Sequence, residues 1–214
     1  MKIQIANFIL TIEKKDVNTD IISELENDKG VIDMARIKKY NDVQDVARYV
    51  IEYCISKGTP ITQIQLQKIM YYIQAAFLVE RNQRCYDEEI LNWEYGPVVR
   101  KVFDDFRTFG SREIDKVPLK VDIDIDDDFN TTYIKTEYNS NDISETDKSL
   151  INKVVEIYRE VKPFELVDKT HNELPWKETT RNSVIPDDLI KEYYYDKKEL
   201  LYGDSQWVVY LIMF

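Results

Sequence analysis

His171 is the only histidine of the chain and the first residue to consider for chemistry. A histidine acts as a general base only beside a nucleophile or a positioned proton donor. The sequence has no G-x-S-x-G or S-x-x-K signature that would mark such a nucleophile. It also has no glycine-rich phosphate loop, which removes most nucleotide-dependent reactions. A hydrogen-bonded structural histidine is therefore favoured over a hydrolase that uses His171 with an Asp or Glu, and we expect no catalytic site.

A run of aspartates in the middle of the chain has the residue type that binds calcium. An EF-hand loop that began at Asp122 would need a glycine at position 127 and a glutamate at position 133. The chain has Asp127 and Tyr133 there, so the motif fails at two defining positions. Two cysteines, Cys54 and Cys85, and one histidine are too few for a zinc site. We expect no metal and no cofactor. The aspartates are interpreted as a solvated acidic face or as a contact surface for a basic partner.

The charge of the 214-residue chain narrows the class of partner. Lys and Arg number 29 against 40 Asp and Glu, so the net charge is −11. Such a chain is not attracted non-specifically to phosphate backbones, and we expect a protein partner rather than nucleic acid. The N-terminal run lacks a small-residue cleavage site, and the apolar run at 207–214 is shorter than the roughly 20 residues that span a bilayer. These features predict a cytoplasmic protein without membrane contact.

Helical periodicity and capping residues predict the elements that position these groups. A first helix begins after Asp42 and ends before Gly58, with its apolar residues in one stripe. Thr62 and Gln65 form a capping box for a second helix, which continues to about Arg81. Further helices are predicted at 144–161, 164–170 and 187–195.

Residues 91–110 combine aromatic residues, a Gly-Pro turn and an apolar helical pattern. Pro97 at the first helical position and Gly110 after the last one predict a helix between them. Trp93 and Tyr95 precede this helix. Aromatic residues serve as core anchors or as interface anchors, and the core is favoured for Trp93.

Strict alternation of apolar and acidic residues from Val121 to Ile125 predicts a short strand. This strand either has one apolar and one acidic face or pairs with 131–138 in an edge hairpin. Two further strands are predicted at 1–12 and 205–214, and these can pair with each other.

Together the elements predict a mainly α fold, a compact helical domain with a small β element. We divide the chain into an N-terminal extension at 1–40 with a strand and a weak helix, a helical domain at 41–196, and a C-terminal strand at 197–214. The C-terminal strand packs either on the helical domain or on the N-terminal strand.

Three segments in this order resemble the Panacea domain family, also described as SocA-like antitoxins or phage-associated GepA-type proteins. The segments are Ile61-Thr62-x-x-x-Leu66-Gln67-Lys68-Ile69-x-Tyr71-Tyr72, Leu91-Asn92-Trp93-Glu94-Tyr95-Gly96-Pro97-Val98-Val99, and Thr170-His171-Asn172-Glu173-x-Pro175-Trp176. The resemblance covers residues 43–195. One departure is Asn92, since the family usually has a small residue such as Ala before the tryptophan.

The resemblance implies a mostly helical, non-enzymatic protein that neutralises a toxin by binding it directly and is carried by phages or mobile elements. One kind of family member delivers its toxin to the protease ClpXP, so a ClpXP-type protease is a further implied partner. The toxin is expected to be basic, because steering between opposite charges speeds association. The alternative is a phage counter-defence protein that binds a host nucleic-acid-handling complex through its acidic surface.

The residues of the family motifs are the candidates for partner binding, although the sequence leaves open whether they lie at the interface or in the core. We expect the two tryptophan motifs to pack on each other around a shared aromatic cluster. The candidates are Trp93, Tyr95, Gly96, Pro97, Thr170, His171, Glu173, Pro175 and Trp176.

Overall fold

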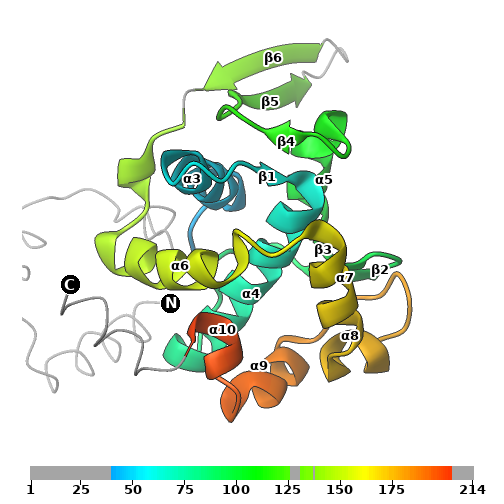
Figure 1. Ribbon diagram of the computed structural model, residues 1–214. Coiled ribbons are helices and arrows are strands. Elements are labelled where there is room, and N and C mark those ends of the chain that lie inside the picture. The colour runs from blue at the N-terminus through cyan, green and yellow to red at the C-terminus, as the bar shows by residue number, and fades with distance from the viewer. Residues whose placement is uncertain (1–39, 126–130, 137, 204–214) are drawn as a thin grey trace, which may run out of the picture. The chain divides into compact units, whose positions relative to one another are not determined.

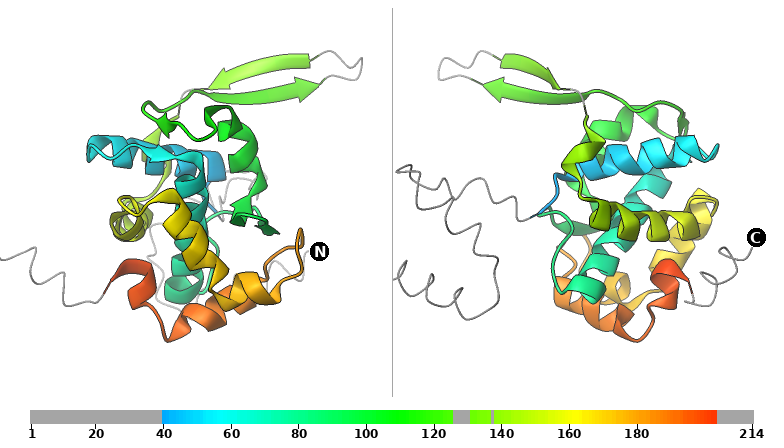
Figure 2. Two further views of the ribbon diagram at one scale, coloured as in Figure 1. Left: turned by 45° about the vertical axis from the view of Figure 1, so that its right-hand side comes forward. Right: turned by 90° about the vertical axis from the view of Figure 1, so that its left-hand side faces the viewer.

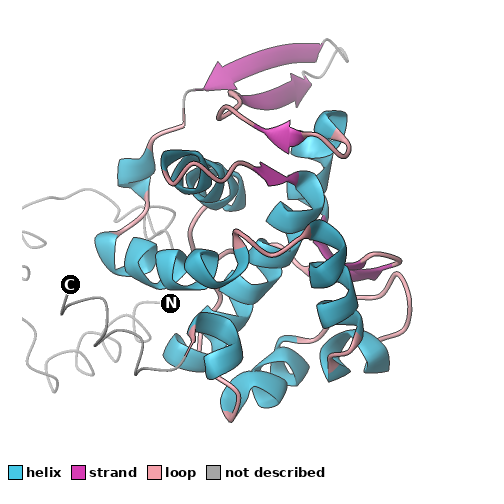
Figure 3. Ribbon diagram, in the orientation of Figure 1, coloured by secondary structure: helices cyan, strands magenta, loops and turns pink. Residues whose placement is uncertain are grey.

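The computed structural model describes residues 40–125, 131–136 and 138–203, with the backbone alone at 121–125. This part is mainly α-helical and contains three antiparallel sheets of two strands each, as the sequence predicted (Figure 3). The helices are α3 (Val43–Ser56), α4 (Gln63–Arg81), α5 (Arg100–Phe106), α6 (Glu145–Tyr158), α7 (Pro163–His171), α8 (Leu174–Glu178), α9 (Asp187–Tyr195) and α10 (Glu199–Tyr202). The strands are β1 (Ile61–Thr62), β2 (Ile90–Trp93), β3 (Gly96–Val99), β4 (Glu113–Ile114), β5 (Lys120–Ile125) and β6 (Thr131–Thr136).

The helix α4 is the element on which most of the others pack. Its predicted capping box is present, because the Thr62 hydroxyl accepts from the Gln65 backbone N–H and the Gln65 side chain accepts from the Thr62 backbone N–H. Every residue from Gln65 to Val79 is buried. Around this helix lie α3, α5, α6, α7, α9, α10 and β3 (Figure 1). A helix buried on all sides needs partners inside the protein for its polar side chains.

Two glutamines of α4 supply such partners and fasten loops to the helix. The Gln67 carbonyl oxygen accepts from the Val99 backbone N–H at 2.8 Å. The Gln74 carbonyl oxygen accepts from the Cys85 backbone N–H at 2.9 Å, and its amide donates to the Tyr86 carbonyl at 3.1 Å. Helix α4 therefore fixes the position of the chain just before β2, at Cys85 and Tyr86, and at the end of β3, at Val99.

The predicted helix start at Pro97 is wrong. Strands β2 and β3 form a hairpin in which Asn92 lies opposite Pro97 and Trp93 lies opposite Gly96, and α5 begins only at Arg100. The two residues between the strands make a tight turn, and Gly96 has φ +97°, a region open to glycine. All four residues of β3 are buried. Pairing with β2 and burial against α4 thus override the local proline and glycine signals.

The predicted hairpin of the acidic strand is confirmed. Strand β5 pairs antiparallel with β6, with Lys120 opposite Thr136. Every residue of β6 is exposed. Lys120 ties the base of the hairpin to α3 through ion pairs with Asp42 at 2.9 Å and Asp45 at 3.5 Å. The hairpin projects away from the helices (Figure 2).

The helices predicted at 144–161, 164–170 and 187–195 are present as α6, α7 and α9, whereas the short helices α8 and α10 were not predicted. The strands predicted at 1–12 and 205–214 lie outside the described residues, and the division of the chain at 40 and 196 stays a prediction. Within the described part, the helices lack the combination of length and apolarity that crossing a bilayer requires.

Candidate partner-binding site

The two tryptophan motifs, which are 83 residues apart in the chain, lie against each other. The Trp176 indole N–H donates to the Trp93 carbonyl at 3.1 Å. The Asn92 amide donates to the carbonyls of Trp176 at 2.8 Å and Thr179 at 2.6 Å. The residue that departs from the family pattern, Asn92, thus links the hairpin to the end of α8.

The tryptophan rings themselves do not share one cluster, contrary to the sequence-based expectation. The Trp93 ring packs edge-on against Phe103, with ring centres 5.1 Å apart. The Trp176 ring stacks on His171 at 3.9 Å. Hydrogen bonds to the backbone, rather than contact between the two indoles, join the motifs.

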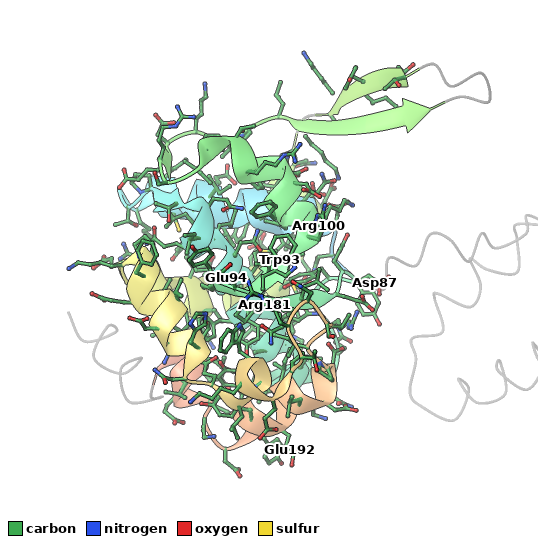
Figure 4. The ribbon with its side chains drawn as sticks, turned by 90° about the vertical axis from the view of Figure 1, so that its right-hand side faces the viewer. Asp87, Trp93, Glu94, Arg100, Arg181 and Glu192 are labelled. Atoms are coloured by element: carbon green, nitrogen blue, oxygen red, sulfur yellow. The ribbon has the colours of Figure 1, made fainter. Side chains whose placement is uncertain are left out.

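The segment that follows α8 extends the hairpin. The Asn92 backbone N–H donates to the Ser183 carbonyl at 2.9 Å, and the Asn182 N–H donates to the Asn92 carbonyl at 2.7 Å. This pairing brings Arg181 beside the hairpin turn, where its guanidinium contacts the Glu94 carboxylate at 2.8 Å. Figure 4 shows Trp93, Glu94 and Arg181 close together at the centre of one face.

Gly96 lies where the hairpin meets α4 and α7. A Cβ atom at this position would lie 2.6 Å from the Thr170 Oγ1 and 2.7 Å from the Lys68 Nζ, closer than real Cβ contacts. Thr170 is fully buried, and its hydroxyl donates to the Val167 carbonyl at 3.0 Å. The absence of a side chain at Gly96 therefore allows the three segments of the family signature to meet.

Lys68 is a buried cation at the centre of this junction. Only 1% of its surface is exposed, and its ammonium donates to the Pro97 carbonyl at 3.1 Å. Burial lowers the pKa of Lys68 to about 7, because removal from water disfavours the charged form.

Replacement of Lys68 is expected to change how stability depends on pH. Between about pH 7 and pH 10.5 the unfolded chain binds more protons at Lys68 than the folded chain, so the free energy of unfolding rises with pH. Relative to Lys68→Met, the wild-type protein should gain up to about 1.4 kcal/mol per pH unit between pH 7.5 and 9.5. Urea unfolding of both proteins across this range measures the gain. The exposed Lys101→Met should follow the wild type, and a pH-independent difference between wild type and Lys68→Met would contradict the account.

Glu173 lies in a second buried polar cluster, formed with tyrosines of α4 and α9. Its carboxylate accepts from the Tyr72 hydroxyl at 3.1 Å and from the Tyr194 hydroxyl at 2.6 Å. The Tyr72 ring stacks on Tyr158 of α6 at 4.0 Å. Burial raises the pKa of Glu173, and the tyrosine hydrogen bonds oppose that rise. This carboxylate thus joins the start of α8 to two neighbouring helices.

His171 has surroundings that fit packing better than proton transfer. Besides its stacking on Trp176, its Nε2 is buried and has no hydrogen-bond partner among the described residues. Burial lowers the pKa of His171, and the charge of Lys68 is the second cause. A backbone hydrogen bond with Glu94 opposes this fall in the pKa of His171, and the structural role expected for this residue stays a prediction.

The motif residues divide into a buried set and a more exposed set, which we call the rim. The rim consists of Trp93, Tyr95, His171 and Trp176, with Glu94 and Arg181 beside them. Five motif residues are buried, three are half-buried, and Tyr95 is 56% exposed at the tip of the hairpin. The buried residues are Gly96, Pro97, Thr170, Glu173 and Pro175, and the half-buried residues are Trp93, His171 and Trp176. Most of the family signature therefore holds the hairpin in place, and its rim is available for contact.

A cavity of about 560 Å³ opens beside the rim, and part of its lining was not identified from the sequence. Gln63, Gln67 and Lys68 of α4 line it. Gln67 and Lys68 stand in the first family segment, but none of the three was a candidate site residue. Polar residues inside a helix that is buried on every side would have indicated a site. The sequence does not show that α4 is buried on every side.

Comparison with known proteins gives one family and one relative. The family model described as "Antitoxin SocA-like, Panacea domain" matches residues 66–177, a range that includes every candidate residue named above. The protein named "Antitoxin SocA" from Caulobacter vibrioides (strain NA1000 / CB15N) is 28% identical over 82 residues, which cover 38% of this chain and 44% of that protein. The match thus spans less than half the length of the curated relative. No solved structure matches the chain significantly.

Proposed function

Because the chain belongs to the Antitoxin SocA-like, Panacea domain family, we propose that it is an antitoxin that neutralises a cognate toxin by binding it directly. It acts without catalysing a reaction, in the cytoplasm, and its gene lies beside that of the toxin on a phage or mobile element. The observation that carries the proposal is the exposed turn of a hairpin whose strands are held by buried motif residues. Buried motif residues hold β2 and β3 against the helices, and Tyr95 is exposed in the turn between the two strands.

The rim has the composition of an interface. Tyr, Trp and Arg are the residues most enriched among those that dominate binding energy. Here Tyr95 and the half-buried Trp93 lie beside Arg181, whose ion pair with Glu94 is 63% exposed on both sides. Such an exposed pair stabilises the fold little, so both charges are free to contact a partner.

A finer proposal concerns the fate of the toxin. We propose that the protein delivers a bound, basic toxin to a ClpXP-type protease, and the acidic net charge of −11 supports fast association with such a toxin. The toxin should then have a shorter half-life in cells that contain the protease than in cells that lack it. An unchanged half-life would leave neutralisation by binding alone.

The rim is tested by the double variant Tyr95→Ala with Arg181→Glu, co-expressed with the product of the adjacent gene. We expect rescue of growth to be lost and the complex to bind at least tenfold more weakly, because an aromatic anchor is removed and the charge at position 181 is reversed. The control is Tyr133→Ala, which removes a tyrosine that is 66% exposed on β6. Normal rescue by the double variant would contradict the proposed interface, and failure of the wild-type chain to bind or rescue would contradict the antitoxin role.

A further inference from the structure

The 560 Å³ cavity lies between the first turns of α4, the β2–β3 hairpin and the segment around Arg181. Its volume falls within the range of small-molecule sites. Figure 4 labels three residues of the lining, Trp93, Glu94 and Arg181, on the face turned toward the viewer. What such a cavity binds is determined by the polar groups that have no partner within the protein.

Two buried glutamine amides in the lining each leave one end without a hydrogen-bond partner. Gln63 and Gln67 are 6% and 2% exposed, and the Nε2 of each has no hydrogen-bond partner among the described residues. They lie four residues apart, so both are on the same face of α4. The orientation of Gln67 is determined chemically, because the Val99 N–H can only donate and must face the amide oxygen. The Gln67 NH₂ group is therefore the part left for a ligand.

Cations accompany these amides. In its charged form, which a nearby anion favours, Lys68 has three protons and makes one hydrogen bond within the described residues, to the Pro97 carbonyl. Arg107 lies in the same lining, and its guanidinium has no ion-pair partner in the part of the chain that the structure describes. At the mouth, Glu94 and Arg181 form an exposed ion pair at 2.8 Å and together add no net charge. Leaving the buried Gln67 NH₂ group without an acceptor costs free energy. Arg107 is exposed and adds a positive charge to the lining, so the group that fits here is an acceptor.

One wall of the cavity is apolar. The ring of Trp93 packs against Phe103, and Val98 and Ile64 complete this side of the lining. A ligand that fills the cavity therefore has an apolar body as well as an acceptor group.

We infer that this cavity binds a carboxylate carried on an aromatic or aliphatic group. A carboxylate has two oxygens with about four acceptor sites, enough to satisfy the amides of Gln63 and Gln67 together with a cation. The source is either a free carboxylic acid or the terminal carboxylate of a peptide, which present the same chemistry. The inference does not depend on toxin binding.

The test compares two probes that differ only in charge, N-acetylphenylalanine and N-acetylphenylalaninamide, titrated into the full chain by NMR. The acid is expected to bind at least tenfold more tightly than the amide, because it alone makes charge-assisted hydrogen bonds with the donors. Shifts should concentrate on the Trp93 indole and the side-chain amides of Gln63 and Gln67. Equal affinities for acid and amide, or binding of neither, would overturn the inference.

Two variants localise the binding. Gln63→Leu and Arg107→Gln should each weaken binding of the acid about three- to tenfold and leave the amide unaffected. Lys101→Gln on α5, whose ammonium faces Glu88 outside the cavity, is the matched control. Urea unfolding confirms that each variant is folded. Unchanged affinity for the acid in both variants would also overturn the inference.

Competition separates the two sources. Displacement of N-acetylphenylalanine by the purified product of the adjacent gene would identify the carboxylate as the terminus of a partner chain. Simultaneous binding of both would identify a free acid. A chain that binds the acid but not the gene product would contradict the proposed function and leave the carboxylate site in place.

Discussion

Gly96→Ala is expected to lower the free energy of unfolding by about 2–4 kcal/mol. Part of the loss is backbone strain, because φ at this position is +97°, where a residue with a Cβ is disfavoured. The larger part is steric, since the new methyl group would lie within 2.9 Å of Thr170 and of two atoms of Lys68. Overpacking of a tight core costs about 1–3 kcal/mol beyond the strain. Chemical denaturation of the purified variant measures the loss.

Gly58→Ala is the matched control for this change. Gly58 also has a positive φ, +72°, but an added Cβ would meet nothing within 4 Å. It should lose only about 1 kcal/mol, the strain without the clash. Equal losses in the two variants would show that close packing at Gly96 is not what joins the hairpin to α4 and α7.

The single substitution Glu173→Ala is expected to lower the free energy of unfolding by about 3–5 kcal/mol. The substitution leaves the hydroxyls of Tyr72 and Tyr194 without their acceptor in the core, and buried unpaired hydroxyls cost about 1–3 kcal/mol each. It also leaves a cavity at the start of α8. Thermal and urea unfolding would show the loss.

Glu173→Gln and Glu165→Ala serve as controls. Gln keeps the volume and one acceptor oxygen, so its loss should be smaller than that of Ala. Since burial raises the folded-state pKa of Glu173 above its ordinary 4.5, wild-type stability relative to Gln falls as the pH rises from 4.5 through that raised pKa. Glu165 is exposed on α7 and its removal should have little effect. If Glu173→Ala were as mild as Glu165→Ala, the buried carboxylate would not hold α8 in place.

The sequence correctly predicted the elements whose ends are determined by contacts between residues close together in the chain. Asp42 accepts from the N–H groups of Gln44 and Asp45 at the start of α3, and Thr62 with Gln65 caps α4. Such caps act through contacts three residues apart, so the sequence displays them directly. The hairpin β2–β3 was missed for the opposite reason. A proline after a turn, as in Gly96-Pro97, is typical of the start of a helix. Only the burial of this segment against α4 favours a strand instead.

The candidate site shows the same division. Family resemblance identified the residues of both tryptophan motifs, but it did not separate the buried Glu173 from the exposed Tyr95. The part of the cavity lining that α4 supplies was missed, although Gln67 and Lys68 stand in the first family segment. Gln63 and Gln67 are polar at helical spacing, which in a sequence is the pattern of a solvated face. Their burial depends on segments far along the chain, including the strand that ends at Val99.

Hydrogen–deuterium exchange of the chain with and without its purified toxin tests the central claim most directly, because it locates the interface on the folded protein. The account predicts slower exchange at the hairpin turn 94–95 and at 180–182, with little change in the hairpin β5–β6. Slower exchange confined to 120–136, as the acidic-surface alternative requires, would contradict the claim that the rim of the family motifs binds the toxin.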